Sequence, residues 1–271
     1  MSGLTRRRVI GVDISTGTFV EHIAVFTEWA KAHRSSYVCC VNAHMTVEAH
    51  NDPAFAAIVN AHMTAEAHND PAFAAIVNGA DSATADGMPV RKAVRVFHRI
   101  QQERVAGNDL LPALLAEAER LQLTVYLYGG KQEVLDAMVA RAAKEHPRLR
   151  FAGVVSPPFR ALSEAEMMAT AERINASGAH IVMVALGCPK QERWMAAMKG
   201  KVNAVMLGLG GAFLLYAGVD SRAPKWMRDL SLEWLYRLAL EPGRLWKRYL
   251  VTNSVFVWLF TKEAVRRLFS K

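Results

Sequence analysis

Short apolar runs alternate with longer helical patterns along most of this 271-residue chain, and this rhythm limits the possible folds more than any other feature. The run Ile181–Leu186 is apolar at successive positions and not only at alternate ones. Such a strand is buried on both faces, as in a parallel sheet that helices cover on both sides. The sequence therefore predicts an α/β fold with a doubly wound, mostly parallel, Rossmann-like sheet.

Several further segments fit the strand and helix patterns. The predicted strands are Val9–Ile14, Tyr37–Val41, Thr124–Tyr128, Phe151–Val155, Ile181–Leu186 and Ala204–Leu209. The predicted helices are Phe19–Ala32, Asp109–Leu121, Gln132–Glu145, Glu164–Ala176 and Gln191–Lys199. Ligands of doubly wound folds bind beyond the carboxyl ends of the strands, so we expect the functional site at that edge of the sheet.

Glycine clusters follow three of the predicted strands. The clusters are Gly129-Gly130, Gly187-Cys188-Pro189-Lys190-Gln191-Glu192 and Gly208-Leu209-Gly210-Gly211. Glycine lets the backbone approach a phosphate, and the amides at a helix N-terminus favour anions. A single cluster fits a tight turn equally well, but three clusters on one sheet edge favour a nucleotide site. None has the spacing of a dinucleotide or Walker motif, so the pattern specifies neither NAD nor ATP.

The last fifty residues, Arg222 to Lys271, are both basic and aromatic. Eleven Lys/Arg against four Asp/Glu give this segment a net charge of +7, against +8 for the whole chain, and four of the six tryptophans lie in it. This mixture suits lipid headgroups or a lipid-linked pyrophosphate. The apolar run Val255–Phe260 is far shorter than the roughly 20 residues that span a bilayer, so we expect the protein to lie on a membrane. Nucleic-acid binding also fits a basic segment, but Pro242 and this apolar run favour a membrane.

The remaining composition is that of an ordinary globular protein, with 52% hydrophobic and 21% charged residues. The cysteines at 39, 40 and 188 lack the spacing of a disulfide framework or a metal site, which predicts a reducing, cytoplasmic compartment. The basic start of the chain, Met1–Arg8, lacks the apolar core of a secretory signal, because Asp13 soon interrupts it.

A block of eighteen residues occurs twice in tandem, as Asn42–Val59 and Asn60–Val77, with Val47 in the first copy replaced by Ala65 in the second. A repeat fold needs about three units or more, so the pair indicates a local duplication. The Asn-Asp-Pro sequence of each copy breaks or starts a helix. We expect two short helices, or a loop and a helix, and the sequence leaves open which copy occupies the original position.

Six segments, taken in order, resemble the WecB/TagA/CpsF glycosyltransferases, which are glycosyltransferase family 26. The segments are Asn42-Ala43-His44; Ala80-Asp81 with Asp86-Gly87-Met88-Pro89; Arg104 to Leu110; Gly187 to Glu192; Gly208 to Phe213; and Arg222 through Tyr249. The resemblance covers nearly the whole chain, and its Pro-Lys-Gln-Glu and Glu-Trp-Leu-Tyr-Arg-Leu elements are highly specific. We expect residues 1–221 to form the catalytic α/β domain and residues 222–271 to form a helical, membrane-associating appendage.

The resemblance implies an inverting, metal-independent transfer of a sugar from a UDP-sugar to an undecaprenyl-diphosphate-linked saccharide for cell-surface polysaccharide synthesis. It also implies a peripheral protein at the cytoplasmic face of the bacterial inner membrane, without a cofactor. N-acetylmannosamine, its uronic acid and glucose are all open as donor sugars, and a homo-oligomer is also open. Because the duplication is foreign to the family pattern, the alternative is a catalytically inactive, membrane-bound family member or scaffold.

The resemblance suggests roles for three polar residues. Asp86 is the candidate general base, since an inverting transfer needs a carboxylate that takes the proton of the acceptor hydroxyl; Asp-Gly alone fits an ordinary turn better. Asn42 is expected to bind the donor sugar or to orient the base, with strand capping as the alternative and Asn60 as its duplicate. Gln191 is expected to bind a sugar hydroxyl or a diphosphate oxygen.

Phosphates are the expected ligands of the glycine clusters and of several basic side chains. The candidate phosphate-binding residues of the sheet edge are Gly130, Gly187, Lys190, Gly208 and Gly210. Those of the appendage are Arg222, Arg237, Arg244 and Arg248, because the guanidinium fork matches phosphate oxygens. Trp234, Trp246 and Trp258 are expected at the level of the lipid headgroups. The alternative for this segment is an amphipathic helix that packs on the core and leaves its basic face in water.

Overall fold

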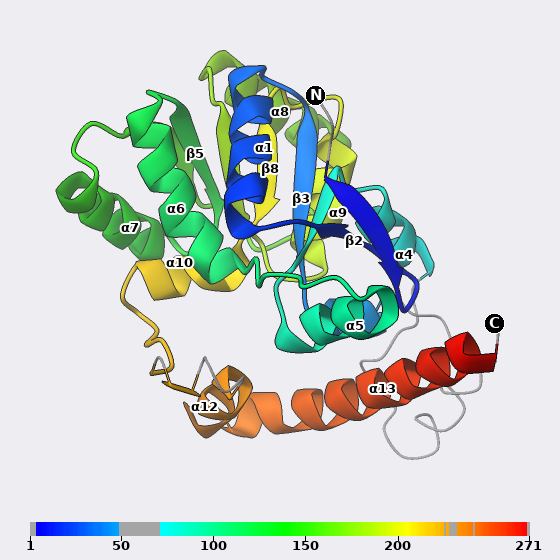
Figure 1. Cartoon of the computed structure of the whole chain (residues 1–271). Helices are drawn as coiled ribbons and strands as arrows, with labels where there is room; N and C mark the ends of the chain where they lie inside the picture. The colour runs from blue at the N-terminus through cyan, green and yellow to red at the C-terminus, as the bar shows by residue number, and fades with distance from the viewer. Residues whose placement is uncertain (1–3, 49–70, 225, 228–231, 241, 270–271) are drawn as a thin grey trace.

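The computed structural model describes residues 4–48, 71–224, 226–227, 232–240 and 242–269. Within them, a six-stranded parallel sheet with the order β4-β3-β8-β7-β5-β6 forms the centre of the molecule (Figure 1). Its strands are β3 (Ser36–Val41), β4 (Ser82–Ala85), β5 (Thr124–Gly129), β6 (Arg150–Val155), β7 (Ile181–Ala185) and β8 (Val205–Gly208).

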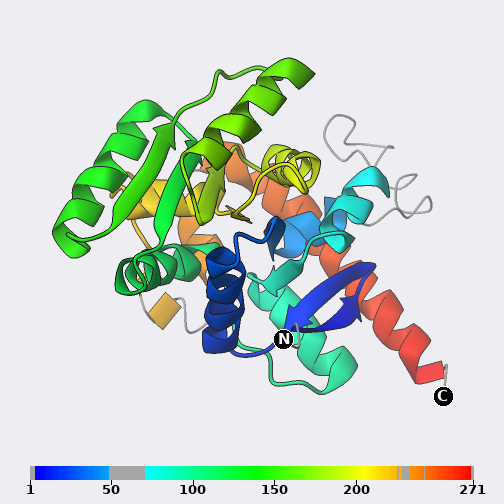
Figure 2. The same ribbon diagram turned by 90° about the horizontal axis from the view of Figure 1, so that it is seen from above.

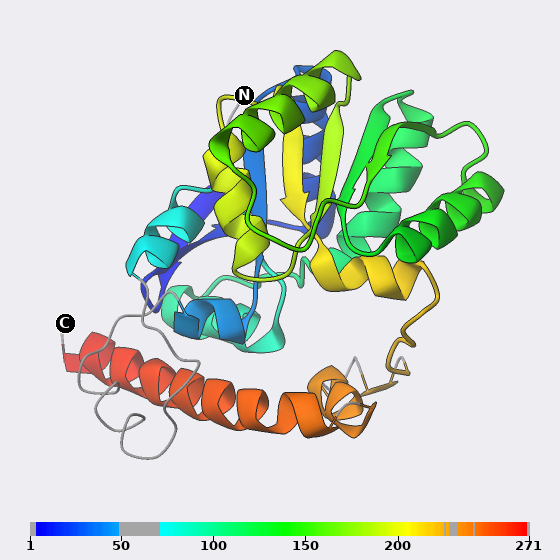
Figure 3. The same ribbon diagram turned by 180° about the vertical axis from the view of Figure 1, so that it is seen from behind.

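Helices cover both faces of the sheet, which confirms the predicted doubly wound α/β fold. One face carries α1 (Phe19–Lys31), α6 (Gly107–Arg120) and α7 (Gln132–Glu145) (Figure 1). The other carries α4 (Pro71–Asn78), α8 (Glu164–Ala176) and α9 (Lys190–Met198) (Figure 3). Seen from above, the two helix layers lie on opposite sides of the strands (Figure 2). Apart from the N-terminal strand, every predicted strand and helix agrees with the structure to within about two residues at each end.

Local sequence explains where two of these helices begin. Thr18 Oγ1 accepts a hydrogen bond from the Glu21 amide at the start of α1, and Glu21 Oε2 accepts one from the Thr18 amide. Ser163 and Glu166 form the same reciprocal pair at the start of α8. Each pair is a capping box, which provides partners for backbone amides that the helix itself leaves unpaired.

The prediction of a single strand at Val9–Ile14 is wrong. The chain instead forms an antiparallel hairpin of β1 (Thr5–Val9) and β2 (Val12–Thr16), which is a separate two-stranded sheet. Ile10 and Gly11 make the turn with φ values of 46° and 79°, as a two-residue hairpin turn of type I′ requires. The turn is buried, and Ile10 is only 4% exposed. The turn therefore carries an apolar residue, and in the sequence it looks like the continuation of a strand.

Strand β4 escapes the sequence pattern because Ser-Ala-Thr-Ala lacks the β-branched and aromatic residues that are typical of strands. Its residues are nevertheless buried, since β2 packs against them and Ser15 Oγ accepts a hydrogen bond from the Ala83 amide at 3.1 Å. Val41 of β3 pairs with Ala85 of β4. The residues that follow, Asn42 and Asp86, therefore leave the sheet side by side.

Several short helices cover the carboxyl ends of the strands. Among them, α2 (Ala43–Glu48) follows β3, α5 (Met88–His98) follows β4, and α10 (Gly210–Tyr216) follows β8. Helix α2 belongs to the first duplicated copy, and α4, which begins at Pro71 of the second Asn-Asp-Pro, belongs to the second copy. Residues 49–70 lie outside the described part of the chain.

The C-terminal segment crosses below this carboxyl edge as α12 (Glu233–Leu240) and α13 (Pro242–Phe269) (Figures 1 and 3). Helix α13 packs against α2 and α5. Its first residue is Pro242, in agreement with the preference for proline in the first turn of a helix. None of the helices in the described ranges is both long enough and apolar enough to cross a bilayer.

Candidate active site

The structure brings Asn42 and Asp86 together at the carboxyl edge of the sheet. The Asp86 amide donates to the Val41 carbonyl oxygen at 3.0 Å, which continues the pairing of β4 with β3. Gly87 packs so closely on Asn42 that a Cβ at Gly87 would lie 3.4 Å from the Asn42 Cα. Asn42 Oδ1 accepts a hydrogen bond from the Met45 amide at 3.1 Å at the start of α2. Asn42 thus caps the start of helix α2, which differs from the strand capping that was its alternative interpretation, and it also adjoins Asp86.

Arg104 lies beside Asp86 and holds its backbone. Arg104 Nε donates to the Asp86 carbonyl oxygen at 2.9 Å, and Arg104 Nη2 lies 4.0 Å from Asp86 Oδ1. The side chains of Asp86 and Arg104 are 25% and 23% exposed, so both can meet a ligand without unfolding.

The charge cluster extends from Arg104 into the C-terminal segment. Arg104 Nη2 donates to Glu233 Oε2 of α12 at 2.8 Å, and Arg104 Nη1 lies 3.8 Å from Asp109 Oδ2. Asp109 Oδ1 in turn pairs with the Arg222 guanidinium. These five residues, Asp86, Arg104, Asp109, Arg222 and Glu233, are called the edge cluster below.

The sequence singled out only Asp86 and Arg222 of the edge cluster as site residues. Arg104 and Asp109 belong to a segment that carries the family resemblance, which was the available signal for them. Glu233 is separated from Arg104 by 129 residues, so no local pattern connects the two.

Gln191 lies inside the protein at the start of α9. Its side chain is 7% exposed, and a Cβ at Gly208 or at Gly210 would lie 2.9 Å from an atom of its amide. Both positions need glycine because they leave room for this amide. Gln191 Oε1 is buried without a hydrogen-bond partner among the described residues. Gln191 can therefore meet a ligand through Oε1 only when its side chain turns outward.

Glu192, the residue after Gln191 in α9, is fully buried. Its Oε1 accepts a hydrogen bond from Gln191 Nε2 at 2.8 Å. Burial raises the pKa of the Glu192 carboxyl, and hydrogen bonds from Gln191 and Cys188 oppose this rise without cancelling it. The pair thus holds the amide of Gln191 in one orientation against the strand ends.

The other predicted phosphate-binding positions lie at the same edge. Lys190 is exposed at the first position of α9, and Gly187 precedes that helix with φ of 79°. A Cβ at Gly210 would lie 3.9 Å from the Gly187 Cα, so the turns after β7 and β8 adjoin. Gly130, with φ of 78°, follows β5, where its carbonyl oxygen accepts a hydrogen bond from Ser156 Oγ at 2.6 Å.

The remaining predicted residues are placed only in part. The backbones of Arg237, Arg244 and Arg248 belong to α12 and α13, but their side chains lie outside the described part of the structure. Asn60, the duplicate of Asn42, lies outside it altogether.

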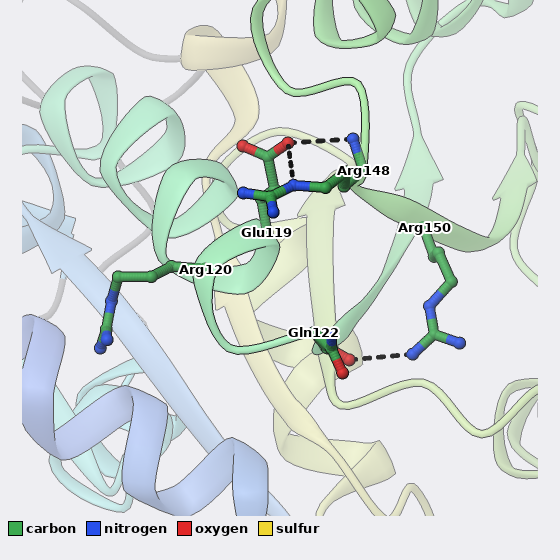
Figure 4. A pocket seen from close by; sticks show the side chains of 5 residues that line it. All are labelled: Glu119, Arg120, Gln122, Arg148 and Arg150. Atoms are coloured by element: carbon green, nitrogen blue, oxygen red, sulfur yellow. Dashed lines mark hydrogen bonds and ion pairs between the residues drawn. The ribbon is translucent and has the colours of Figure 1, made fainter.

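A pocket of about 380 Å³ opens at the opposite, amino-terminal end of the strands (Figure 4). Its lining residues are Glu119, Arg120, Gln122, Arg148 and Arg150. Arg150 donates to the Gln122 carbonyl oxygen, and the Arg148 amide donates to Glu119 (Figure 4). None of the predicted site residues lines this pocket.

Among the described residues, no group of three or more His, Cys, Asp and Glu side chains is arranged so that it could hold a metal ion.

Comparison with known proteins matches the chain to a family model and to a related protein. The model of the glycosyl transferase WecG/TagA/CpsF family matches residues 7–60 and 55–269, and the two matched segments meet within the duplicated blocks. The chain is also 33% identical, over 185 residues, to N-acetylglucosaminyldiphosphoundecaprenol N-acetyl-β-D-mannosaminyltransferase of Bacillus subtilis (strain 168). That similarity covers 68% of this chain and 70% of the relative.

Proposed function

Since the chain belongs to the glycosyl transferase WecG/TagA/CpsF family, we propose that this glycosyltransferase moves a sugar from a UDP-sugar to an undecaprenyl-diphosphate-linked saccharide. The name of the Bacillus relative favours N-acetylmannosamine as the sugar and N-acetylglucosaminyl-diphosphoundecaprenol as the acceptor. The uronic acid of N-acetylmannosamine and glucose are the other donor sugars to test. The observation that carries the mechanism is the pairing of β3 with β4, because it puts Asn42 and Asp86 at one edge beside Arg104.

Asp86 acts as the general base in this proposal. The acceptor hydroxyl gives its proton to the Asp86 carboxylate while its oxygen bonds to the anomeric carbon of the donor sugar. The bond between that carbon and the UDP oxygen breaks on the opposite side, so UDP leaves with the bonding electrons and the configuration inverts. Arg104 supports this role because it holds the Asp86 carbonyl oxygen through Nε and places its guanidinium 4.0 Å from the Asp86 carboxylate.

The diphosphate of the donor is proposed to lie along the turns after β7 and β8. Lys190 supplies an exposed cation there, and Gly187 and Gly210 let the backbone approach phosphate oxygens. Arg222 supplies a second cation from the C-terminal segment, at present paired with Asp109. These positions agree with a negatively charged leaving group at the carboxyl edge of the sheet.

The C-terminal segment is proposed to rest on a lipid surface. Within the described ranges, ten of the sixteen most exposed large apolar side chains belong to residues 226–269. They are Trp226, Trp234, Leu235, Leu240, Trp246, Leu250, Val257, Val265, Leu268 and Phe269. Such a concentration of exposed apolar area marks an interaction surface. On α13, Trp246, Leu250 and Val257 lie on one side of the helix at its period of about 3.6 residues, opposite the buried Val255 and Leu259.

The function is tested by UDP release from UDP-N-acetylmannosamine in the presence of N-acetylglucosaminyl-diphosphoundecaprenol in detergent or vesicles. We expect turnover by the full chain and a loss of about 100-fold or more in Asp86→Asn. Asp136→Asn, which changes an exposed carboxylate on α7, is the matched control and should keep full turnover. Normal turnover by Asp86→Asn would exclude Asp86 as the base. Turnover should also survive EDTA, which tests the predicted independence from metal ions.

The duplication supports one alternative, in which the extra block leaves this family member inactive. The observation behind it is that the two matched segments of the family model meet within the duplicated blocks. Deletion of Asn60–Val77 separates the two possibilities. If UDP release occurs only in the shortened chain, the duplication abolishes activity; equal release by both forms rules this alternative out.

A further inference from the structure

Helix α12 carries three large apolar side chains outward, packs against α13, and contacts the α/β body through polar groups. Trp234 and Leu235 are each 42% exposed, and Leu240 is 56% exposed. By contrast, Glu233 at the start of α12 is 18% exposed and points into the edge cluster. The burial of this helix against the body is therefore small, and its position depends on directional contacts.

Glu233 supplies two directional contacts between α12 and the α/β body, and Tyr236 of α12 makes a further hydrogen bond with Ser221. One carboxylate oxygen accepts from Arg104 Nη2 at 2.8 Å, and the other lies 3.5 Å from Asn108 Nδ2. Arg104 lies just before α6, and Asn108 lies in the first turn of α6. A charged hydrogen bond that is only partly exposed is stronger than a neutral one and fixes the relative direction of its two groups.

Arg104 connects this contact to the proposed base. The same guanidinium that binds Glu233 through Nη2 binds the Asp86 carbonyl oxygen through Nε at 2.9 Å. A guanidinium is planar and rigid, so its Nε and Nη2 cannot move independently. The docking of α12 and the placement of Asp86 are thus linked by one flat group.

We propose that Glu233 is a positioning residue that docks α12 on the carboxyl edge and, through Arg104, sets the position of Asp86. This inference rests on the proposed function for its link to turnover. The reaction would then proceed at full rate only when the C-terminal segment lies on the sheet edge. Two arginines meet three carboxylates in the edge cluster, so loss of the Glu233 charge still leaves Arg104 with Asp86 and Asp109 as partners, and the variant should fold.

The test compares Glu233→Gln with Glu263→Gln in the full chain. Glu263 is an ion-paired carboxylate of the same C-terminal segment, but its partners are Arg266 and Arg267, away from Asp86. Amide hydrogen exchange of residues 232–240 is measured without substrate, and UDP release is measured with donor and acceptor. For Glu233→Gln we expect exchange in α12 to rise about tenfold and kcat to fall about tenfold, with the KM for the donor nearly unchanged. Glu263→Gln should change neither quantity.

A charge-swapped variant separates docking from the placement of Asp86. Arg104→Glu together with Glu233→Arg restores an ion pair but removes the donor to the Asp86 carbonyl oxygen. We expect slow exchange in α12 to return while kcat stays low. Unchanged exchange in Glu233→Gln would overturn the docking role, and fast exchange with normal kcat would overturn the link to Asp86. If the wild-type protein releases no UDP, the proposed function fails, while hydrogen exchange still decides the docking role.

Discussion

The two ends of the C-terminal segment are attached to the α/β body in different ways. The later part of α13 buries Val255, Phe256 and Leu259, and Phe260 stacks on Phe97 of α5 with ring centroids 4.9 Å apart. Helix α12 leaves Trp234, Leu235 and Leu240 exposed to solvent and is tied to the body by Glu233.

The two attachments contribute different things: apolar burial contributes free energy of folding, and the ion pair contributes a defined orientation. Apolar burial contributes about 1.5–3 kcal/mol for each large side chain, so the later part of α13 is an integral part of the fold. A partly exposed ion pair such as Arg104–Glu233 contributes about 1 kcal/mol, but it requires a defined geometry. We therefore expect α12 to separate from the body without unfolding, while the end of α13 does not.

Phe256→Ala should have the largest effect on stability. Phe256 is 5% exposed against the core, and truncation of a buried phenylalanine lowers the free energy of unfolding by about 3–5 kcal/mol. Denaturant unfolding measures this loss. Val257→Ala is the matched control, because Val257 is the next residue on α13 and 62% exposed, so it should change stability by about 0.5 kcal/mol or less. Equal losses in both variants would contradict the conclusion that α13 buries the side that carries Phe256 and exposes the side that carries Val257.

Trp246→Ser combined with Leu250→Ser should weaken membrane binding more than stability. The two side chains are 47% and 57% exposed, so their removal leaves the core intact but takes away apolar area that a lipid surface would cover. Co-sedimentation with vesicles that contain anionic phospholipid should show affinity reduced about tenfold. Val20→Ser on α1, where Val20 is 73% exposed, should bind vesicles like the wild type. A similar loss in that control would indicate that the apolar side of α13 has no special role.

Glu263→Gln should have the smallest effect, and one that depends on pH. Burial raises the pKa of Glu263, but hydrogen bonds from Arg266 and Arg267 outweigh it, so the net shift is downward from 4.5. A carboxyl whose pKa is lower in the folded state stabilises the protein above its unfolded pKa, and this contribution disappears as the pH falls through the folded pKa.

The variant should therefore be less stable than the wild type by about 0.5 kcal/mol at pH 7. The difference should close as the pH falls below 4.5. Thermal unfolding over a series of pH values measures it. A gap of constant size across this range would show that the effect of Glu263 comes from packing and not from its charge.

The sequence pattern predicted the central sheet because its strands are apolar on both faces over several residues. It failed at the N-terminal hairpin and at β4, where tertiary contacts and not strand propensity decide the structure. The turn residue Ile10 is apolar because the turn is buried. Ser82–Ala85 forms a strand because β2 covers it. Neither cause is visible in a window of neighbouring residues.

The sequence also placed Asn42 correctly at the end of a strand, but it did not place Asp86 at one, because β4 was not among the predicted strands. It could not show that Gln191 turns inward between Gly208 and Gly210, or that Arg104 joins Asp86 to Glu233. Side-chain direction depends on packing with residues from other strands, and those partners lie far away in the chain.

By itself, the sequence determined the α/β class and the family, because these follow from periodic burial and from short motifs; it also predicted a site at the carboxyl edge of the sheet. Only the tertiary structure decided that the basic aromatic segment has one end anchored by burial and another held by an ion pair. The physical reason is that a helix shows the same periodicity whether its apolar side meets a core or solvent. Which of these it meets is settled by the surface against which it packs.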